Sequence, residues 1–132
     1  MNQEQFRQLP HLVMLHHLNE LGYGRPTVSK FVDCGVLVRV SPKGSGKARY
    51  QKRQVAALLK WEGLLDTSGF AQEKPMMDAK AVMRWTGWSD TTLANIARAG
   101  GLTLVKPPGA KKGKFQKSEI AALIGLATPP IT

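Results

Sequence analysis

Acidic residues, cysteines and long apolar runs are scarce in this chain. Its 132 residues include 9 Asp and Glu against 19 Lys and Arg, and one cysteine, Cys34. A single cysteine excludes an internal disulfide framework and favours a reducing compartment. No apolar run approaches the roughly 18 residues of a membrane span, and the first ten residues lack the pattern of a secretion signal. We therefore expect a cytoplasmic protein with one domain or two very small ones.

The residue groupings that carry metal, cofactor or catalytic chemistry are also missing. The sequence has no CxxC and no HxxxH spacing, and the adjacent His16 and His17 would point about 100° apart on a helix. The glycines between Lys43 and Lys47 lack the GxxxxGK[ST] order of a phosphate-binding loop. No Ser/His/Asp grouping stands out, and the chain is too short for the large catalytic folds. We expect no metal, no cofactor and no enzymatic activity.

Basic residues are abundant and concentrated. The formal net charge is +10, and eleven of the 19 cations lie in two blocks without acids, 39–53 and 106–117. Glycine and proline interrupt both blocks, so neither forms an amphipathic membrane-binding helix. Cationic loops of this kind favour a polyanionic partner such as nucleic acid.

The chain is an internal duplication. At a shift of 65 residues, segment 10–59 aligns with segment 75–124 without a gap and shares 14 identities in 50 positions, beginning with Pro10 on Pro75. A repeat of this period indicates two copies of one structural unit. A core of about 50 residues is marginal by itself, so we expect the two units to support each other.

Both units predict one order of elements: helix, tight turn, helix, hairpin, helix. Leucines recur at helical spacing from Leu12 to Leu21 and predict a helix that ends at Gly22, whereas Asp78 can cap its counterpart in the second unit. Gly35 and Gly100 occupy positions that suit left-handed helix ends. The other expected elements are helices at 26–34, 54–65, 90–99 and 119–126, and strands at 37–40, 49–51, 102–105 and 114–116.

This order divides the chain into unit 1 (8–65), a linker (66–74) and unit 2 (75–127). Four apolar residues in and before the linker, Trp61, Leu64, Leu65 and Phe70, are too hydrophobic for a free tether. We expect them to pack between the units and to fix their orientation.

Two helices joined by a tight turn and followed by a basic hairpin form the winged helix-turn-helix plan. The segments Gly22–Leu37 and Gly87–Leu102 resemble the excisionase and MerR-like branch of that family. The resemblance covers roughly 100 residues. It implies a mainly α fold with small β-hairpin wings, arranged as two tandem winged helix-turn-helix units. Copy 1 has Gly24 where a polar cap is usual, and copy 2 has Asp90 in place of Arg25, so the copies need not read the same DNA.

The resemblance implies that the second helix of each unit enters the major groove of DNA. The implied base-reading residues are Arg25, Thr27, Ser29, Lys30, Ser89, Thr91, Thr92, Asn95 and Arg98. The implied wing residues on the phosphate backbone are Lys43, Lys47, Arg49, Lys111, Lys112 and Lys114. Thr27 and Thr92 have an alternative role as helix-start hydroxyls that bond their own backbone.

We therefore expect a sequence-specific double-stranded DNA-binding protein of bacterial or phage type, located in the cytoplasm at the nucleoid. It would act as a transcriptional regulator or as an excisionase-like recombination directionality factor, possible partners being an integrase or another DNA-acting protein. The alternatives are the DNA-recognition subunit of phage packaging, RNA binding, and a protein–protein adaptor built on winged units. One chain would present two recognition helices, as a symmetric dimer does, and would act as a monomer or as a weak oligomer on DNA.

Overall fold

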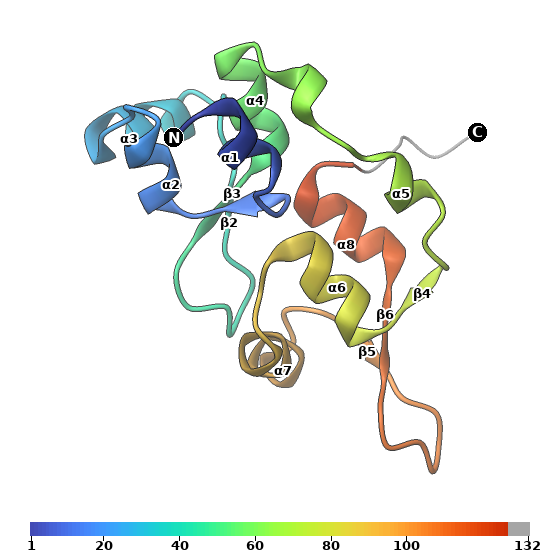
Figure 1. The fold of residues 1–132 in the computed structure, drawn as a ribbon. Helices are drawn as coiled ribbons and strands as arrows, with labels where there is room; N and C mark the ends of the chain where they lie inside the picture. The colour runs from blue at the N-terminus through green and yellow to red at the C-terminus, as the bar shows by residue number, and fades with distance from the viewer. Residues whose placement is uncertain (127–132) are drawn as a thin grey trace, which may run out of the picture.

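The computed structural model describes residues 1–126, which fold as two consecutive units with the same order of elements (Figure 1). About 48% of these described residues are helical and 11% are in strands. The expected small hairpins among helices are therefore confirmed, but each hairpin gains a third strand, which makes the chain mixed α/β. The expected end of unit 2, residue 127, lies outside the described residues.

The two units match element by element. Unit 1 consists of α1 (Gln3–Arg7), β1 (Leu12–Val13), α2 (Leu15–Glu20), α3 (Arg25–Asp33), β2 (Arg39–Val40), β3 (Arg49–Gln51) and α4 (Lys52–Leu59). A 3-10 turn, η1 (Glu62–Leu64), leads onward. Unit 2 consists of α5 (Ser68–Ala71), β4 (Met76–Met77), α6 (Ala79–Thr86), α7 (Asp90–Ala99), β5 (Leu104–Val105), β6 (Lys114–Gln116) and α8 (Lys117–Ile124).

Each unit contains a three-stranded antiparallel sheet, in the order β1-β3-β2 or β4-β6-β5. Leu12 pairs with Gln51 and Val13 with Tyr50, so the predicted helix from Leu12 to Leu21 is wrong at its beginning. Helical and extended periodicities are hard to separate over a segment as short as Leu12–Val13. Pairing with the distant β3 makes this segment a strand. The helix that remains, α2, begins at Leu15.

A buried lysine attaches the short helix α1 to unit 1. Lys52, which is 2% exposed, donates from Nζ to the carbonyl oxygens of Arg7 at 2.9 Å and Leu9 at 2.8 Å. The same ammonium group lies 5.4 Å from the centroid of the Phe6 ring. A five-residue helix is not stable by itself in water, so these contacts and the burial of Phe6 hold α1 in place.

Lys117 does the same for α5 in unit 2. Its Nζ donates to the carbonyl oxygens of Ala71 and Glu73, both at 3.1 Å, and lies 5.4 Å from the Phe70 ring centroid. The segment 66–74, expected to be a linker, therefore includes a helix that repeats α1. Phe70 is buried in the core of unit 2.

The sequence alignment of the two units has no gap, but their structural alignment requires one. The amide of Lys52 donates to the carbonyl of His11, whereas that of Lys117 donates to Pro75. Pro75 thus takes the place of His11, and its expected pairing with Pro10 is wrong by one residue. Helix α6 has eight residues and α2 has six, but the turn at 87–89 is one residue shorter than the turn at 21–24. The net gain of one residue restores the shift of 65 at the start of α7.

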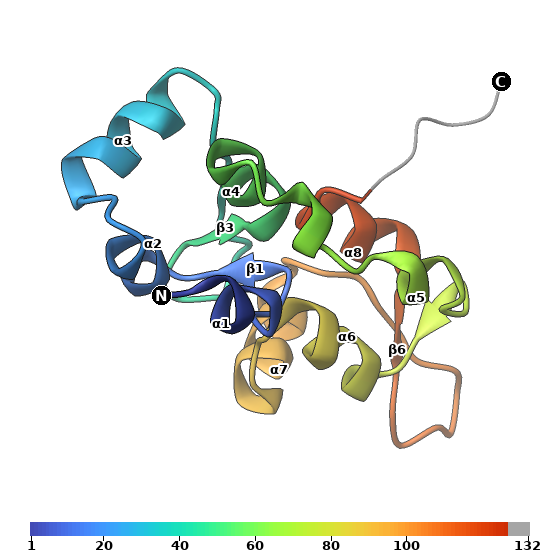
Figure 2. The same cartoon turned by 45° about the horizontal axis from the view of Figure 1, so that its top comes forward.

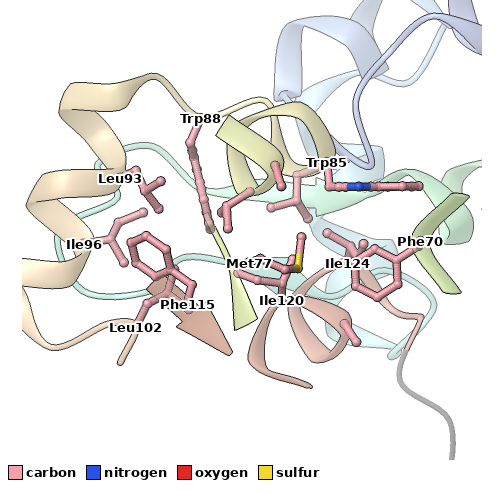
Figure 3. Packing of buried hydrophobic residues seen from close by; sticks show 14 of the residues in the cluster. Phe70, Met77, Trp85, Trp88, Leu93, Ile96, Leu102, Phe115, Ile120 and Ile124 are labelled. Carbon is pink, nitrogen blue, oxygen red and sulfur yellow. The ribbon is translucent and has the colours of Figure 1, made fainter. Parts of the chain in front are cut away.

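The units have separate cores that meet at one boundary. The core of unit 1 gathers around Phe6, Leu18 and Tyr50. Figure 3 shows the core of unit 2, in which Trp88 lies beside Leu93 and the Phe70 ring meets Trp85 edge-on at 5.0 Å. Two residues of unit 1 also belong to the unit 2 core: Leu12 and Val40.

Polar groups of unit 1 cap the helices of unit 2 across this boundary. His11 N donates to Trp85 O at 3.0 Å, Arg49 Nη1 to Thr86 O at 3.4 Å, Gln51 Nε2 to Leu123 O at 3.1 Å and Arg53 Nη1 to Gly125 O at 2.7 Å. The acceptors lie at the carboxyl ends of α6 and α8, where carbonyl oxygens lack partners within the helix and attract positive charge. The contact is head to tail, because different faces of the two units meet.

The residues around η1 do not form this boundary. Trp61, Leu64 and Leu65 pack on the core of unit 1, and Phe70 packs within unit 2. The expectation that they pack between the units is therefore wrong. Trp61, Leu64 and Leu65 follow α4 directly and cover their own unit. The surface of unit 1 that contacts unit 2 is therefore formed by its sheet and hairpin (Figure 2).

Candidate nucleic-acid interface

Helix α7 presents an exposed polar face. Ser89 caps its start by accepting the amide of Thr92 at 3.2 Å, and Gly100 ends it with a φ of 85°. Leu93 and Ile96 point into the core, which leaves Thr91, Asn95 and Arg98 exposed on the outer side. These three are spaced by four and three residues, so they share one helix face.

Two of the expected base-reading residues of unit 2 bond to each other instead. Ser89 and Thr92 pair through their hydroxyl oxygens at 3.0 Å, in addition to the capping bond. Both bonds lie at the start of α7, and the Thr92 hydroxyl bonds the Ser89 side chain rather than its own backbone, which was the alternative role considered from the sequence.

Helix α3 exposes all four expected residues of unit 1: Arg25, Thr27, Ser29 and Lys30. Its cap is Gly24, which offers no side-chain oxygen, and a proline lies in its first turn. Only Val28 is fully buried along this helix. In both views of the ribbon α3 lies away from α7, on the outer side of unit 1 (Figures 1 and 2).

A groove of about 1040 Å³ lies between α6, α7 and the β5–β6 hairpin. Its cationic lining consists of Lys80, Arg98, Lys111, Lys112 and Lys114. Its two carboxylates are Asp78, which caps α6 by accepting the amide of Ala81 at 2.8 Å, and the exposed Asp90. Its floor is apolar and includes Leu93 and Phe115. The groove thus combines positive walls with a hydrophobic base.

Lys80 belongs to this groove although sequence reasoning did not single it out. It lies in the first turn of α6, two residues after the cap Asp78. The cap was recognisable in the sequence, but that α6 faces the hairpin follows only from the fold.

Loop 1 (41–48) and loop 2 (106–113) carry cations without acidic partners. Lys43, Lys47, Lys111 and Lys112 are all exposed. Within residues 1–126 the side-chain ion pairs are Arg7–Glu4 and Arg84–Glu73, and neither involves a loop. The positive charge of both loops therefore faces solvent and is available to an anion.

Arg49 differs from the other residues expected on the wings. It is half-buried and donates to the carbonyl of Thr86 in unit 2. Burial lowers the pKa of its guanidinium from the ordinary value. Arg49 therefore holds the two units together, whereas Lys114 at the equivalent position is exposed in the groove.

Histidine and cysteine side chains do not assemble into a ligand set. The rings of His16 and His17 lie against each other with centroids 4.0 Å apart and planes tilted by 47°, and Cys34 is exposed. No group of three or more His, Cys, Asp or Glu residues that could hold a metal occurs within residues 1–126. In the same residues no helix has the length and apolarity needed to cross a bilayer.

Comparison of the chain with protein-family models, curated proteins and solved structures gives no significant match.

Proposed function

We propose that the chain binds double-stranded DNA in a sequence-specific manner as two tandem winged helix-turn-helix units. In this proposal α3 and α7 are recognition helices, and loops 1 and 2 are wings. The observation that carries it is the exposed polar face of α7 beside a groove with five cations. A helix that follows another through a tight turn and exposes polar side chains is suited to the major groove.

The exposed side chains suggest separate roles. Asn95 suits the edge of adenine, and Arg25 suits the O6 and N7 acceptors of guanine. The remaining exposed helix residues, Thr27, Ser29, Lys30, Thr91 and Arg98, flank these two on their helices. The loop lysines suit phosphate oxygens, which supply affinity without sequence information.

The biological roles consistent with this proposal are transcriptional regulation, excisionase-like control of recombination with an integrase as partner, and DNA recognition in phage packaging. All three rest on one physical act, the docking of a recognition helix on duplex DNA. The proposal places the protein at the nucleoid, acting as a monomer with an internal repeat.

A protein–protein adaptor is the second candidate, because one observation favours it. The groove has an apolar floor that includes Leu93, Ala97 and Phe115, and a partner helix could bury its own apolar face there. In that case the loop lysines would contribute solubility or contact an acidic partner.

A salt titration of binding to duplex DNA, single-stranded DNA and RNA tests the proposal. The probes are a pool of random duplexes, followed by the best sequence selected from it. We expect the selected duplex to bind most tightly, with log K falling linearly against log salt. Replacing Lys43, Lys47, Lys111 and Lys112 with alanine should flatten that slope by about 2–4, since each lost phosphate contact removes about 0.9.

Two single substitutions test the base readout on the selected duplex. Arg25→Ala and Asn95→Ala should each relax the preference at different base pairs, by about 1–3 kcal/mol for a bidentate contact. If the wild-type chain shows no preference for duplex over single strands, or an unchanged slope in the fourfold lysine variant, the adaptor becomes the better explanation.

A further inference from the structure

Loop 1 extends from its own unit and packs on α7. It approaches the helix closely at Gly44, which has a φ of 88°. A Cβ atom at this glycine would lie 2.8 Å from the carbonyl carbon of Asn95 and 3.0 Å from Cα of Ile96. At Gly101, just after α7, a Cβ would lie 2.6 Å from the carbonyl oxygen of Lys43. Gly44 and Gly101 thus allow the backbone of loop 1 to contact the backbone of α7 and the residue that follows it.

The equivalent loop of unit 2 makes no such contact. Gly109 corresponds to Gly44 and has a similar φ of 81°, but a Cβ atom there would meet nothing within 4 Å. The neighbouring valines differ in the same way, since Val40 is 5% exposed and Val105 is 40% exposed. Loop 1 is therefore held against the other unit, whereas loop 2 extends into solvent.

As a result, α7 has a basic loop on each side. Figure 1 shows α7 almost end-on between the hairpin loop of unit 1 and that of unit 2. Loop 1 packs on the backbone of α7 at Asn95 and Ile96, and Arg98 lines the groove beside loop 2. The exposed lysines of loop 1 are Lys43 and Lys47, and those of loop 2 are Lys106, Lys111 and Lys112.

We propose that loop 1, α7 and loop 2 form one composite DNA site, in which loop 1 serves the helix of the other unit. The proposal rests on the DNA-binding function proposed above. A helix in the major groove has a phosphate strand on each side, because the groove, about 12 Å wide, lies between the two backbones. A single winged unit supplies one loop and therefore one flank, but here both flanks are cationic.

This arrangement assigns different tasks to the two helices. Helix α7 reads the central base pairs with a wing along each strand. Helix α3, which lies away from α7, contacts a separate stretch of the duplex. The site is therefore asymmetric, and a DNA target without twofold symmetry is expected.

Backbone footprinting on the selected duplex tests the composite site. The Asn95→Ala variant first identifies the base pairs that depend on α7, and Arg25→Ala those that depend on α3. Three paired alanine variants are then compared: Lys43/Lys47, Lys111/Lys112, and Arg25/Lys30. We expect the two loop variants to lose phosphate protection on opposite sides of the Asn95-dependent base pairs, each with a salt slope smaller by about 1–2.

A matched pair of glycine variants tests the placement of loop 1. Gly44→Ala and Gly109→Ala carry the same cost of positive φ, but only the first meets the backbone of α7. We expect Gly44→Ala to weaken duplex binding several-fold more than Gly109→Ala, and to lose the same protections as the Lys43/Lys47 variant.

The outcomes separate the two proposals. If the wild-type chain binds the duplex but the Lys43/Lys47 variant loses protection only beside the Arg25-dependent base pairs, the composite site is wrong and DNA binding stands. Equal effects of Gly44→Ala and Gly109→Ala would also overturn it. If the wild-type chain shows no duplex binding, both proposals fail.

Discussion

At the scale of single residues, buried polar side chains hold neighbouring elements of the fold together. Lys52 ends beneath α1 with two carbonyl partners, and burial lowers the pKa of its ammonium group to about 8. His11 lies beside it, is 8% exposed and packs on Trp85 with ring centroids 4.9 Å apart and planes tilted by 34°. Both residues lie near the boundary between the units, so their substitution affects more than a local contact.

Replacing Lys52 with methionine should lower the free energy of unfolding by about 1–3 kcal/mol, because the carbonyls of Arg7 and Leu9 lose their donor. Urea unfolding followed by tryptophan fluorescence measures the change. The control is Lys106→Met at an exposed loop position, which should leave the midpoint unchanged. Equal midpoints for the two variants would contradict the role assigned to Lys52.

The stability of the protein should fall between about pH 6.5 and pH 4 because of His11. Burial, with a smaller contribution from Lys52, lowers the pKa of His11 to about 4, whereas Asp66 opposes the shift. In this pH range His11 binds a proton in the unfolded chain but not in the folded chain, so the free energy of unfolding decreases as pH falls. The loss reaches about 3 kcal/mol for a shift of this size.

Urea unfolding of wild type and His11→Leu across this range isolates that contribution. The variant should lose less stability than wild type between pH 6.5 and pH 4. A His11 ring that titrates near pH 6.5 by NMR would show that the ring is not desolvated in the folded state.

At the scale of elements, the two candidate recognition helices begin differently. Helix α7 starts at Ser89, whose hydroxyl accepts an amide, and α3 starts at Gly24, which offers no side-chain acceptor. Ser89→Ala should therefore lower stability by about 1 kcal/mol. The exposed neighbour Thr91 serves as the control, because Thr91→Ala should leave stability almost unchanged.

Chemical unfolding combined with duplex binding distinguishes capping from base reading at Ser89. We expect Ser89→Ala to change stability and to retain the selected base preference. A variant of normal stability with an altered preference would instead assign the Ser89 hydroxyl to DNA.

At the scale of the whole molecule, the units depend on each other. Leu12 and Val40 of unit 1 complete the core of unit 2, and donors of unit 1 cap the ends of α6 and α8. We expect the full chain to unfold in one cooperative transition. A fragment containing residues 67–132 loses these partners and should be less stable, with Trp85 more accessible to quenchers.

Calorimetry of the full chain and of the fragments 1–66 and 67–132 tests this expectation. Two fragments that each melt at the temperature of the full chain would show that the boundary contributes nothing. Arg53→Ala in the full chain provides a milder test, since it removes one of the caps on α8.

The duplication and several helix ends could be predicted from the sequence because they depend on local chemistry. Asp78 caps α6, Ser89 caps α7, and Gly35 and Gly100 adopt a positive φ, as expected. A capping oxygen or a left-handed glycine acts within a few residues of the chain, so its signal is local. The exposed faces of α3 and α7 follow from their periodicity in the same way.

The tertiary structure alone decided the third strand of each sheet, the helices α1 and α5, and the packing of loop 1 on α7. Strand β1 depends on pairing with β3, some 38 residues away, and α1 depends on the ammonium group of Lys52. Arg49 was expected on DNA because its charge is visible in the sequence, but its partner Thr86 belongs to the other unit. Contacts between distant segments have no local signature, and Gly44 and Gly109 are alike in sequence until the fold places α7 beside only one of them.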